Sequence, residues 1–472
     1  MVRATEGKVD FLTRLPHTSA HPCPETQGRI QVQLSSRDGW ASMESNTKSV
    51  KKVVILGAGS GGVGTALALR SAAGRSSGVE VVLLDQKDYY TALPMTYQVV
   101  TGSVAPSHIS FPLRKLFGKK GGLEALTFRR AHVQGIDLDR RIVRTDDGEL
   151  PWDYLVVALG STTNFFGMSD VEQVALPFRS LKDGVAIHNR IVDNYEAALS
   201  AQDEQTRREL LTFVVVGGGP TGVELAAHVR EYADRVLARY YPSLSKAARV
   251  ILIEAQDTVL PGMNAKTREL ALSRLKSHGV EVMLKTRLGG AWQGGVRTAG
   301  GDTIPTRALV WCAGIKPVSV VQTMPFDKAK DGRILVDGYL QVPKSSGVYA
   351  LGDCAYLEQA SGSGPYPPTF QVAYRQGSVC ARNIVNHLRG RPPRPYSSQF
   401  LGQIFYVDRN TAVAQLFGRV FDGYVAGMVR RALFIGMLVN YAGPLTGVDT
   451  KLKAALDWIF AYFYNRNVAR LD

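Results

Sequence analysis

A short buried-strand pattern that runs into a glycine-rich turn constrains the fold more than any other feature of this chain. Four consecutive apolar residues, Val53 to Leu56, lead into the turn Gly57-Ala58-Gly59-Ser60-Gly61-Gly62. A helical stretch follows from Val63 to Ala73, and the strand Glu80 to Leu84 then closes on Asp85. This order of strand, turn, helix, strand and acid predicts a dinucleotide-binding unit.

The same arrangement occurs a second time, 160 residues further along the chain. Phe213 to Val216 lead into Gly217-Gly218-Gly219-Pro220-Thr221-Gly222, and a long helix is expected from Val223 to about Tyr241. The strand Arg249 to Ile253 then ends on Glu254. Two such units predict an α/β fold with two Rossmann-like dinucleotide-binding domains. They also predict two dinucleotides face to face, a nicotinamide that delivers hydride and a flavin that receives it.

Each glycine of the motif, and the acid that follows it, has a physical role in this interpretation. The first glycine permits a tight turn, the second lets the backbone approach a pyrophosphate, and the third lets the helix pack closely on the strand. The acid accepts hydrogen bonds from a ribose diol, and in the second unit its charge disfavours a 2′-phosphate, so we expect NADH rather than NADPH. The residues predicted on these grounds are Gly57, Gly59, Gly62 and Asp85 for the flavin dinucleotide, and Gly217, Gly219, Gly222 and Glu254 for NADH.

Charge and cysteine content narrow the function classes. The chain has 56 Lys and Arg against 41 Asp and Glu, a net charge of +15, which favours an acidic partner such as an anionic membrane. It shows no concentrated basic stripe or recognition module, so we expect no nucleic-acid partner. The four cysteines lie far apart without a CxxC pair, which disfavours a zinc ribbon, a disulfide-rich scaffold and a vicinal dithiol. We predict no metal site.

Neither a membrane-spanning helix nor a signal peptide is predicted. The longest uncharged apolar-rich stretch, Ala432 to Val448, has 17 residues and contains Asn440 and Pro444, whereas a span needs about 20 apolar residues. The first 25 residues lack an apolar core. Residues 1–50 are polar and aperiodic, so we predict a disordered extension, with Met43 as an alternative start.

Further segments resemble those of flavoproteins with two dinucleotide-binding domains. Among these the chain is most similar to the type II NADH dehydrogenases, the single-chain NADH:quinone oxidoreductases of respiratory membranes. The likeness covers about residues 51 to 466 and is carried by Tyr89–Pro94, Tyr97–Gly102, Tyr154–Gly160, Trp311–Gly314, Val348–Asp353 and Pro368–Gly377. The resemblance implies FAD as the flavin, a quinone as the acceptor and a homodimer. Because no spanning helix is expected, neither is proton pumping.

The resemblance also implies roles for single residues. Asp353, after Gly352 in the second flavin signature, holds the ribityl chain of FAD in relatives, although an Asp there can also cap the next helix. Gly160 and Gly314 mark where the chain leaves the FAD and NADH domains. We expect Gly160 and Gly352 to contact FAD, and Gly314 to contact NADH. Glu224 lies in relatives close to the contact between nicotinamide and flavin, where a proton-handling role is expected. An acid in a first helical turn is also favoured by the helix dipole alone.

The predicted quinone-facing segment departs from the pattern of the family. Gln371 matches the first Gln of that pattern, but Phe370 replaces an Ala and Arg375 replaces a second Gln. Arg375 adds a fixed cation with several donors, so the type of quinone stays open. We expect Gln371 and Arg375 to contact the quinone. The alternative for Gln371 is a polar residue that satisfies backbone groups at a helix N-terminus.

The C-terminal part is expected to associate with a membrane. A helix from about Thr450 to Asn465 has an apolar stripe, with Asp457 roughly opposite, and Arg430 and Arg431 are further candidate contacts with lipid phosphates. The stripe consists of Leu452, Leu456, Ile459, Phe460 and Phe463. Packing on its own domain or on a dimer partner is the alternative. We expect a peripheral protein on the cytoplasmic face of the inner or cell membrane.

The predicted domain order places the NADH domain inside the FAD domain. It consists of an extension (1–50), the first FAD part (51–165), the NADH domain (166–325), the second FAD part (326–390) and a membrane-anchoring or dimerisation region (391–472). Two alternatives share this architecture. A sulfide:quinone oxidoreductase needs a cysteine pair at the flavin, and no Cys occurs between Cys23 and Cys312. A ferredoxin or rubredoxin reductase would instead pass electrons to an acidic protein.

Overall fold

The computed structural model describes most of the chain beyond the N-terminal extension. The described residues are 50–73, 78–116, 126–362, 364–398, 402–407, 411–440, 452, 453, 455–457, 459, 460 and 466–471. Apart from Val50, the predicted extension lies outside the described residues.

A five-stranded parallel sheet forms the centre of the first half of the structure. Its strands are β21 (Val348–Ala350), β9 (Tyr154–Val157), β1 (Lys51–Leu56), β2 (Val79–Asp85) and β5 (Leu126–Arg130), in this spatial order. Val53 to Leu56 are fully buried in β1, the central strand. A strand buried on both faces of a parallel sheet needs such a continuous apolar run, which is why this segment could be predicted. β21 joins this sheet although it follows β9 by almost 200 residues.

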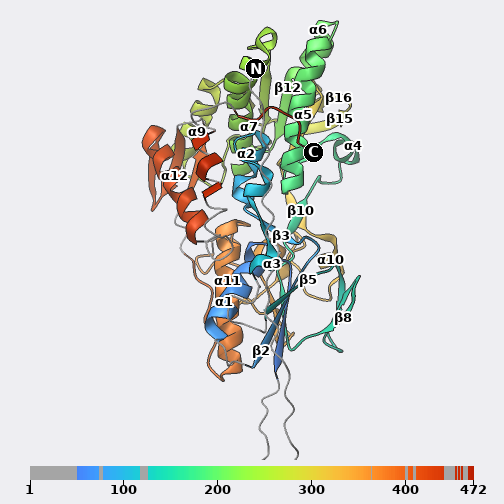
Figure 1. Ribbon diagram of the computed structural model, residues 1–472, viewed down its shortest axis with the longest axis vertical. Coiled ribbons are helices and arrows are strands. Elements are labelled where there is room, and N and C mark those ends of the chain that lie inside the picture. The colour runs from blue at the N-terminus through green and yellow to red at the C-terminus, as the bar shows by residue number, and fades with distance from the viewer. Residues whose placement is uncertain are drawn as a thin grey trace, which may run out of the picture. The chain divides into compact units, whose positions relative to one another are not determined.

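Two helices from opposite ends of the sequence pack closely beside this sheet. α1 (Ser60–Ala73) follows β1, α11 (Phe370–Leu388) follows β21, and the two lie side by side (Figure 1). Glycines permit the approach, because a Cβ at Gly377 would lie 2.4 Å from the carbonyl oxygen of Gly61. α1 begins at Ser60, three residues before the predicted start, so the last residues of the glycine-rich turn form its first turn.

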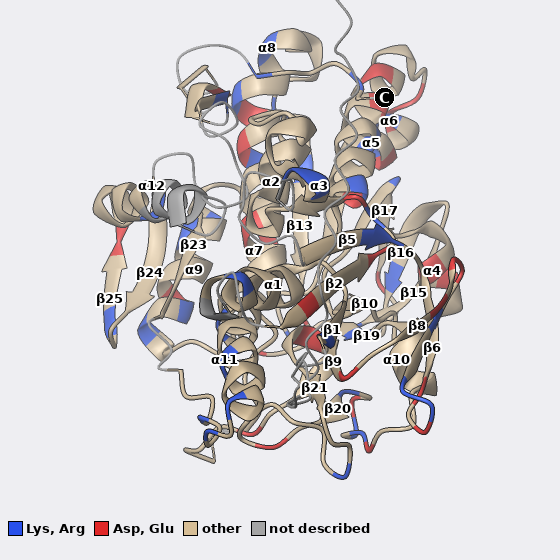
Figure 2. Cartoon of the chain, turned by 60° about the horizontal axis from the view of Figure 1, so that its bottom comes forward, with Lys and Arg blue, Asp and Glu red and all other residues tan. Residues whose placement is uncertain are grey.

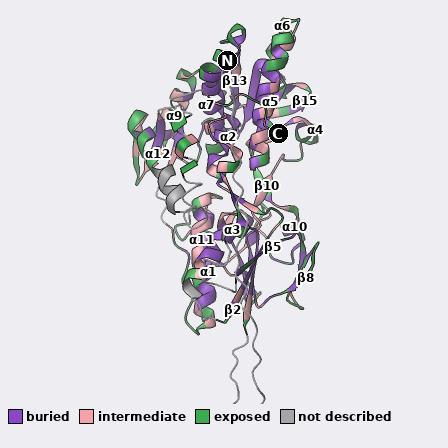
Figure 3. Ribbon diagram, viewed as in Figure 1, coloured by how far each residue is buried: buried purple, intermediate pink, exposed green. Residues whose placement is uncertain are grey.

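A second five-stranded parallel sheet repeats this plan. Its order is β11 (Leu176–Pro177), β18 (Ala308–Trp311), β12 (Thr212–Val216), β13 (Arg249–Ile253) and β14 (Val280–Met283). Four helices accompany it, namely α5 (Leu181–Ser200), α6 (Glu204–Leu211), α7 (Pro220–Tyr232) and α9 (Ala265–Ser277). Figure 3 shows buried residues gathered along the strands and on part of α5. Both predicted Rossmann-like units are present, which confirms the predicted fold class.

The long helix of the second unit differs from the prediction at its start. α7 begins at Pro220 and not at Val223, because proline fits the first helical position, where its missing N–H leaves no hydrogen bond unmade. Beyond Tyr232 the helix continues through a π-helical turn, Ala233–Leu237, and a last turn, α8 (Ala238–Tyr240).

Smaller elements connect the two sheets and cover their edges. β10 (Ser161–Thr163) and β19 (Ile315–Pro317) pair antiparallel where the chain passes between the two halves. A short helix, α2 (Thr96–Val100), packs against both α5 and α7. The remaining small sheets are β3 (Tyr89–Thr91) with β4 (Ser110–Pro112), β6 (Val133–Asp137) with β7 (Ile142–Thr145) and β8 (Gly148–Pro151), β15 (Leu288–Trp292) with β16 (Gly294–Thr298) and β17 (Thr303–Thr306), and β20 (Ile334–Leu335) with β22 (Ala355–Tyr356).

The C-terminal region forms a small antiparallel sheet and a helix. The strands are β23 (Gly402–Tyr406), β24 (Ala412–Leu416) and β25 (Arg419–Asp422), and α12 (Gly423–Asn440) follows. Figure 2 shows α12 almost entirely in tan, because Arg430 and Arg431 are its only charged residues. Its exposed side chains include Tyr424, Val425 and Met428. Among the described residues, no helix has the length and apolarity needed to cross a membrane.

The last described residues return to the body of the protein. Residues 452, 453, 455–457, 459 and 460 are helical, in agreement with the predicted helix, while Phe463 lies outside the described residues. The Asp457 carboxylate contacts Nδ1 of His108 at 2.5 Å and accepts the N–H of Ala105 at 3.2 Å. The helix therefore contacts the FAD-binding half through Asp457, which lies outside its apolar stripe.

Residues 466–471 form a C-terminal strap across α5, α7 and the end of α2. Arg466 forms an ion pair with Glu231, and the Tyr232 hydroxyl donates to the carbonyl oxygen of Asn467. Asn189 exchanges two hydrogen bonds with the backbone of Leu471. This strap was not predicted from the sequence.

Candidate active site

The first glycine-rich turn has the close approaches that its motif requires. Gly57 has a φ of +97°, and a Cβ there would lie 2.4 Å from the carbonyl oxygen of Ala158. A Cβ at Gly62 would lie 1.8 Å from the carbonyl oxygen of Gly57, so the third glycine brings α1 onto β1. At Gly59, by contrast, no other described segment lies within 4 Å of a Cβ. The second glycine thus leaves room in front of the helix N-terminus, where a pyrophosphate binds in such motifs.

Asp85 is held at the end of β2 by backbone hydrogen bonds. Its carboxylate accepts the N–H groups of Ala58 at 2.7 Å and Lys87 at 2.8 Å. Burial raises the pKa of this carboxyl, and the N–H groups of Lys87 and Ala58 partly offset the rise. The acid therefore fixes the glycine turn, and carboxylate oxygens can accept more than one hydrogen bond each, as a ribose diol requires.

The second turn repeats this geometry almost residue for residue. Gly217 has a φ of +111°, and a Cβ at Gly222 would lie 1.8 Å from the carbonyl oxygen of Gly217. Gly219, like Gly59, has no other described segment within 4 Å of a Cβ. Glu254 accepts the N–H groups of Gly218 at 2.5 Å and Gln256 at 2.8 Å.

Gly160 and Gly314 follow the strands that flank the two turns. Gly160 comes after β9 with a φ of +71° and has open space around it. Gly314 comes after β18, and a Cβ there would lie 2.5 Å from the ring of Phe166, a residue whose side chain is exposed. Both lie where the chain enters the β10–β19 pair between the two halves.

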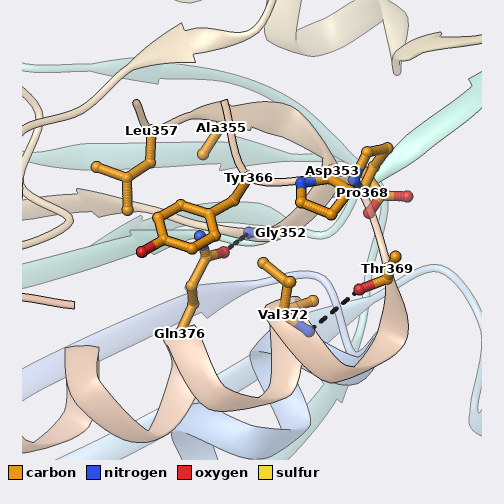
Figure 4. Close-up of a pocket in the computed structure, with 11 residues that line it drawn as sticks. Gly352, Asp353, Ala355, Leu357, Tyr366, Pro368, Thr369, Val372 and Gln376 are labelled. Carbon is orange, nitrogen blue, oxygen red and sulfur yellow. Dashed lines mark hydrogen bonds between the residues drawn. The ribbon is translucent and has the colours of Figure 1, made fainter. Parts of the chain in front are cut away.

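Asp353 lies in a short 3₁₀ turn after β21 and lines a pocket (Figure 4). The pocket is formed by this turn, the segment from Tyr366 to Thr369 and the first turns of α11. Thr369 caps α11 by accepting the N–H of Val372, and the amide oxygen of Gln376 accepts the N–H of Gly352 at 2.8 Å. An acidic side chain is thus presented at the N-terminus of a long helix.

The residues present fit two dinucleotides. Each half offers an open second glycine at a helix N-terminus and an acid fixed beside the turn, and the first half adds Asp353. Phosphate oxygens suit the N–H groups and the positive end of the dipole at such a terminus. Among the described residues, no group of three or more His, Cys, Asp or Glu side chains could hold a metal ion.

The residues expected to contact the quinone lie on one side of α11. Gln371 is exposed in the first turn and does not line the pocket, whereas the buried Gln376 does. Arg375 is half-buried and donates to the Ser398 hydroxyl at 2.9 Å. The Phe370 ring stacks on Tyr374 at 6.1 Å, so the residue that departs from the family pattern is part of a local aromatic pair.

Glu224 is the centre of a buried cluster that joins three parts of the chain. Its Oε1 accepts hydrogen bonds from Arg430 at 2.9 Å and from the N–H of Tyr406 at 3.0 Å. The Arg430 guanidinium also donates to the Tyr97 hydroxyl. Burial raises the pKa of Tyr97 to about 12, so this hydroxyl is protonated at neutral pH. His228 stacks on Tyr406 at 3.5 Å and on Tyr97 at 4.2 Å.

The expectation that Arg430 contacts lipid phosphates is wrong. Its side chain is only 10% exposed, and its guanidinium lies over the rings of Tyr97 and Tyr406. The charge is stabilised by Glu224 and by the two aromatic faces. A cation beside an apolar stretch indicates a membrane surface only if it faces outward, and the sequence pattern could not show which way Arg430 points.

The cysteines lack the properties of a redox pair at the flavin. Cys354 is fully buried, and burial raises the pKa of its thiol to about 11. Burial raises the pKa of Cys312 to about 12. Cysteine reacts as the thiolate, so neither thiol is poised for reaction at neutral pH.

Comparison with known proteins identifies the family. A model of the pyridine nucleotide-disulphide oxidoreductases matches residues 51–377. The type II NADH:quinone oxidoreductase Ndh of Mycobacterium tuberculosis is 30% identical over 433 residues, which cover 88% of this chain and 89% of that protein. The chain belongs to the type II NADH:quinone oxidoreductases, within that wider family. The resemblance found in the motifs is confirmed.

Other relatives agree with this assignment. The demethylphylloquinone reductase NdbB of Synechocystis is 28% identical over 423 residues, covering 88% of this chain and 98% of that protein. NDH2 of Plasmodium falciparum, solved in complex with NADH, has a TM-score of 0.80 at 16% identity. The match covers 89% of the present chain and 100% of the NDH2 chain. At this identity the similarity to NDH2 concerns the fold alone.

Several residues of the site were missed by the sequence analysis. They are Arg179, Ser161 and Gln376, which contact Asp353 or its turn, and His228, Tyr406 and Arg430, which surround Glu224. Tyr97 was part of a quoted motif but had no assigned role. No local pattern marks such residues, because all of them except Gln376 contact a partner far away in the sequence.

Proposed function

We propose that this chain oxidises NADH through a bound FAD and passes the electrons to a membrane quinone, without pumping protons. Two complete dinucleotide-binding units in one chain carry this proposal. Hydride transfer between nicotinamide and flavin, and electron transfer from flavin to quinone, are chemistry that bound FAD supplies. Membership of the type II NADH:quinone oxidoreductases supports the choice of donor and acceptor.

The contribution of the chain is to bind and orient the two dinucleotides. Gly57, Gly59 and Gly62 with Asp85 would hold the FAD diphosphate and ribose, with Asp353 on the ribityl chain. Gly217, Gly219 and Gly222 with Glu254 would hold NADH. The Glu254 carboxylate is buried beside Gly218, so a 2′-phosphate would meet a negative charge there, and we expect selectivity for NADH.

Gln371 and Arg375 are proposed to face the quinone from α11. Both are accessible on the first turns of this helix, and both can donate hydrogen bonds to a quinone oxygen. Glu224 lies in α7, four residues beyond its N-terminus, and we propose that its carboxylate acts near the end of the helix that receives NADH. It pairs there with the Arg430 guanidinium at 2.9 Å.

Membrane association is proposed through the exposed apolar side chains of the C-terminal region. Leu452 is 57% exposed, Ile459 50% and Phe460 53%, while Asp457 on the opposite side contacts the body of the protein. A helix held in this way can place its apolar stripe in the membrane interface. A quinone is apolar, which gives the enzyme a reason to lie on the membrane. We further propose a homodimer, located at the cytoplasmic face of the membrane.

An anaerobic titration tests the electron path. The visible flavin band of the purified protein should bleach on addition of NADH, bleach less readily with NADPH, and return on addition of a short-chain quinone. Bleaching without recovery would move the search to a protein acceptor. No bleaching with NADH, despite bound flavin, would overturn the assignment of the donor.

A matched pair of variants tests the quinone contact. We expect Gln371→Ala to lower the rate of quinone reduction severalfold and to leave the rate with ferricyanide unchanged, because a small soluble oxidant needs no quinone site. Gln202→Ala, at an exposed loop position, is the control. Equal quinone rates in both variants would remove Gln371 from the proposed site.

Vesicle flotation tests the membrane surface. Substituting both Leu456→Glu and Ile459→Glu should lower binding to anionic vesicles at least about tenfold, because two apolar contacts are lost and two negative charges face the lipid phosphates. Leu199→Glu, at an exposed apolar position of α5, should bind as the unaltered protein does. Full binding by the double variant would contradict this proposal.

A further inference from the structure

The carboxylate of Asp353 is held by a cation from the other half of the structure. The guanidinium of Arg179 donates through Nη2 to Asp353 Oδ2 and, at 2.5 Å, to the hydroxyl of Ser161. The Ser161 hydroxyl itself lies 2.8 Å from the same carboxylate oxygen. The Asp353 side chain is only 13% exposed and that of Arg179 32%. Hydrogen bonds between ionised groups in such partly dry surroundings are stronger than neutral ones.

Arg179 itself is fixed in place by the start of α5. It directly precedes Ser180, the N-cap of that helix, and Asp183 accepts the backbone N–H groups of both Arg179 at 2.8 Å and Ser180 at 2.7 Å. This capping box ties the backbone of Arg179 to a 20-residue helix that packs beside the second parallel sheet. The guanidinium is therefore delivered to Asp353 from a rigid element of the NADH-binding half.

Asp353 is held from the opposite side as well. Gln376 of α11 accepts the N–H of Gly352, the residue before Asp353, which has a φ of +73°. The Asp353 carboxylate has two partners among the described residues, Arg179 and Ser161, and both contact Oδ2. Oδ1 is thus the oxygen that these contacts leave to accept a hydrogen bond from a ligand hydroxyl.

We propose that Arg179 is a positioning residue for FAD. It holds Oδ2 of Asp353 so that Oδ1 is presented to the ribityl chain, and it makes the retention of FAD depend on the NADH-binding half. Without the guanidinium, Asp353 would lose the charged donor that fixes its rotamer. The inference rests on the assignment of Asp353 to FAD and not on the identity of the electron acceptor.

The rate of FAD release from the holoenzyme tests this role without NADH or quinone. After dilution, released FAD is followed by the rise of its fluorescence, and circular dichroism checks the fold. We expect Arg179→Met to release FAD about tenfold faster or more, and Arg179→Lys to fall between Met and the unaltered protein. The control is Arg307→Met, which removes a cation of the same half that pairs with Glu209 at 3.0 Å. Its release rate should not change.

Two further variants separate positioning from general stabilisation. Ser161→Ala removes one of the two groups on Oδ2 and should speed release less than Arg179→Met does, and it keeps the test open if the Met variant does not fold. In an Asp353→Asn background, Arg179→Met should add less than a twofold effect, because its partner charge is already gone. A release rate within twofold of the unaltered protein in both Arg179→Met and Ser161→Ala would overturn the proposal. A full Arg179→Met effect in the Asn background would also overturn it.

Discussion

We expect the stability of the protein to depend strongly on the ion pair between Arg466 of the C-terminal strap and Glu231. Arg466 donates through Nη1 to one carboxylate oxygen at 2.5 Å and through Nη2 to the other at 3.0 Å. The two side chains are only 8% and 4% exposed. The Arg466→Met variant keeps much of the side-chain length and removes the charge, so Glu231 is left as a buried carboxylate without its partner.

The size of the effect follows from this burial. Breaking a buried ion pair by removing one partner costs about 3–5 kcal/mol of stability. Part of this loss can be relieved, because Arg466 belongs to the strap. If the strap undocks in the variant, water reaches the Glu231 carboxylate. The loss is then limited to the free energy of strap docking, which includes the bonds to Tyr232 and Asn189. We therefore expect about 3 kcal/mol, at the low end of the range.

Urea denaturation gives the free energy of unfolding, and hydrogen exchange reports the strap directly. In Arg466→Met we expect faster exchange at the N–H of Asn467, which bonds to Gly102, and of Leu471, which bonds to Asn189. The matched control is Arg470→Met in the same strap. Arg470 pairs with Asp193 at 3.2 Å, with side chains 62% and 44% exposed, and a pair in such exposure contributes about 0–1 kcal/mol.

Two results would refute this reasoning. One is an Arg466→Met variant no less stable than Arg470→Met. The other is a double variant, Arg466→Met with Glu231→Gln, that recovers none of the lost unfolding free energy. Most of the loss is expected to come from the unpaired buried charge of Glu231, which the Gln substitution removes. Recovery of most of the stability in the double variant is the expected outcome.

Three other predictions follow from single positions. Gly219→Ala should raise the KM for NADH at least about tenfold and leave the fold intact, because its Cβ would meet only the ligand. Gly222→Ala should instead destabilise the domain, because its Cβ would lie 1.8 Å from the carbonyl oxygen of Gly217. Steady-state kinetics and melting curves distinguish the two effects. Burial, with smaller contributions from Arg430 and Arg466, holds the pKa of His228 well below 6.5. The unfolded chain therefore takes up a proton first, and the free energy of unfolding falls as the pH drops below 6.5. His228→Phe should lessen this fall by about 1.4 kcal/mol per pH unit, and an unchanged slope of unfolding free energy against pH would contradict this prediction. Cys354→Ala should leave quinone reduction unchanged, since its thiol is buried and protonated, and loss of all activity would revive a sulfide-type mechanism.

The dinucleotide-binding units could be predicted from the sequence because their determinants are local. Gly57, Gly62 and Asp85 lie within 29 positions of one another, and the contacts of Gly62 with Gly57 and of Asp85 with Ala58 are set by the strand-turn-helix geometry. The same local rule explains why the helix starts were placed three residues late. Serine and proline fit first-turn positions that apolar periodicity alone does not detect.

The partners of Asp353 and Glu224 could not be predicted, because they come from distant segments. Arg179 is 174 positions from Asp353, and Arg430 is 206 from Glu224. A guanidinium in a sequence carries no sign of whether it faces lipid, water or a buried carboxylate. The error at Arg430 has this origin, since the charge was assigned to the membrane because of the apolar residues around it. Only the packing of α12 on the C-terminal sheet, which brings Arg430 to Glu224 of α7, decides the matter.

The position of Arg430 gives the C-terminal region a role besides the membrane attachment proposed for it. Its guanidinium contacts Tyr97 in α2, Glu224 in the helix proposed to receive NADH, and the ring of Tyr406 in the C-terminal sheet. Removing this region would leave the Glu224 carboxylate without its cation and would expose the faces of Tyr97 and His228. A buried charge that has partners in three parts of a chain keeps those parts in one relative arrangement, because any separation leaves ionised groups unpaired. The C-terminal sheet and α12 are therefore held against Glu224, the residue proposed to act where NADH binds.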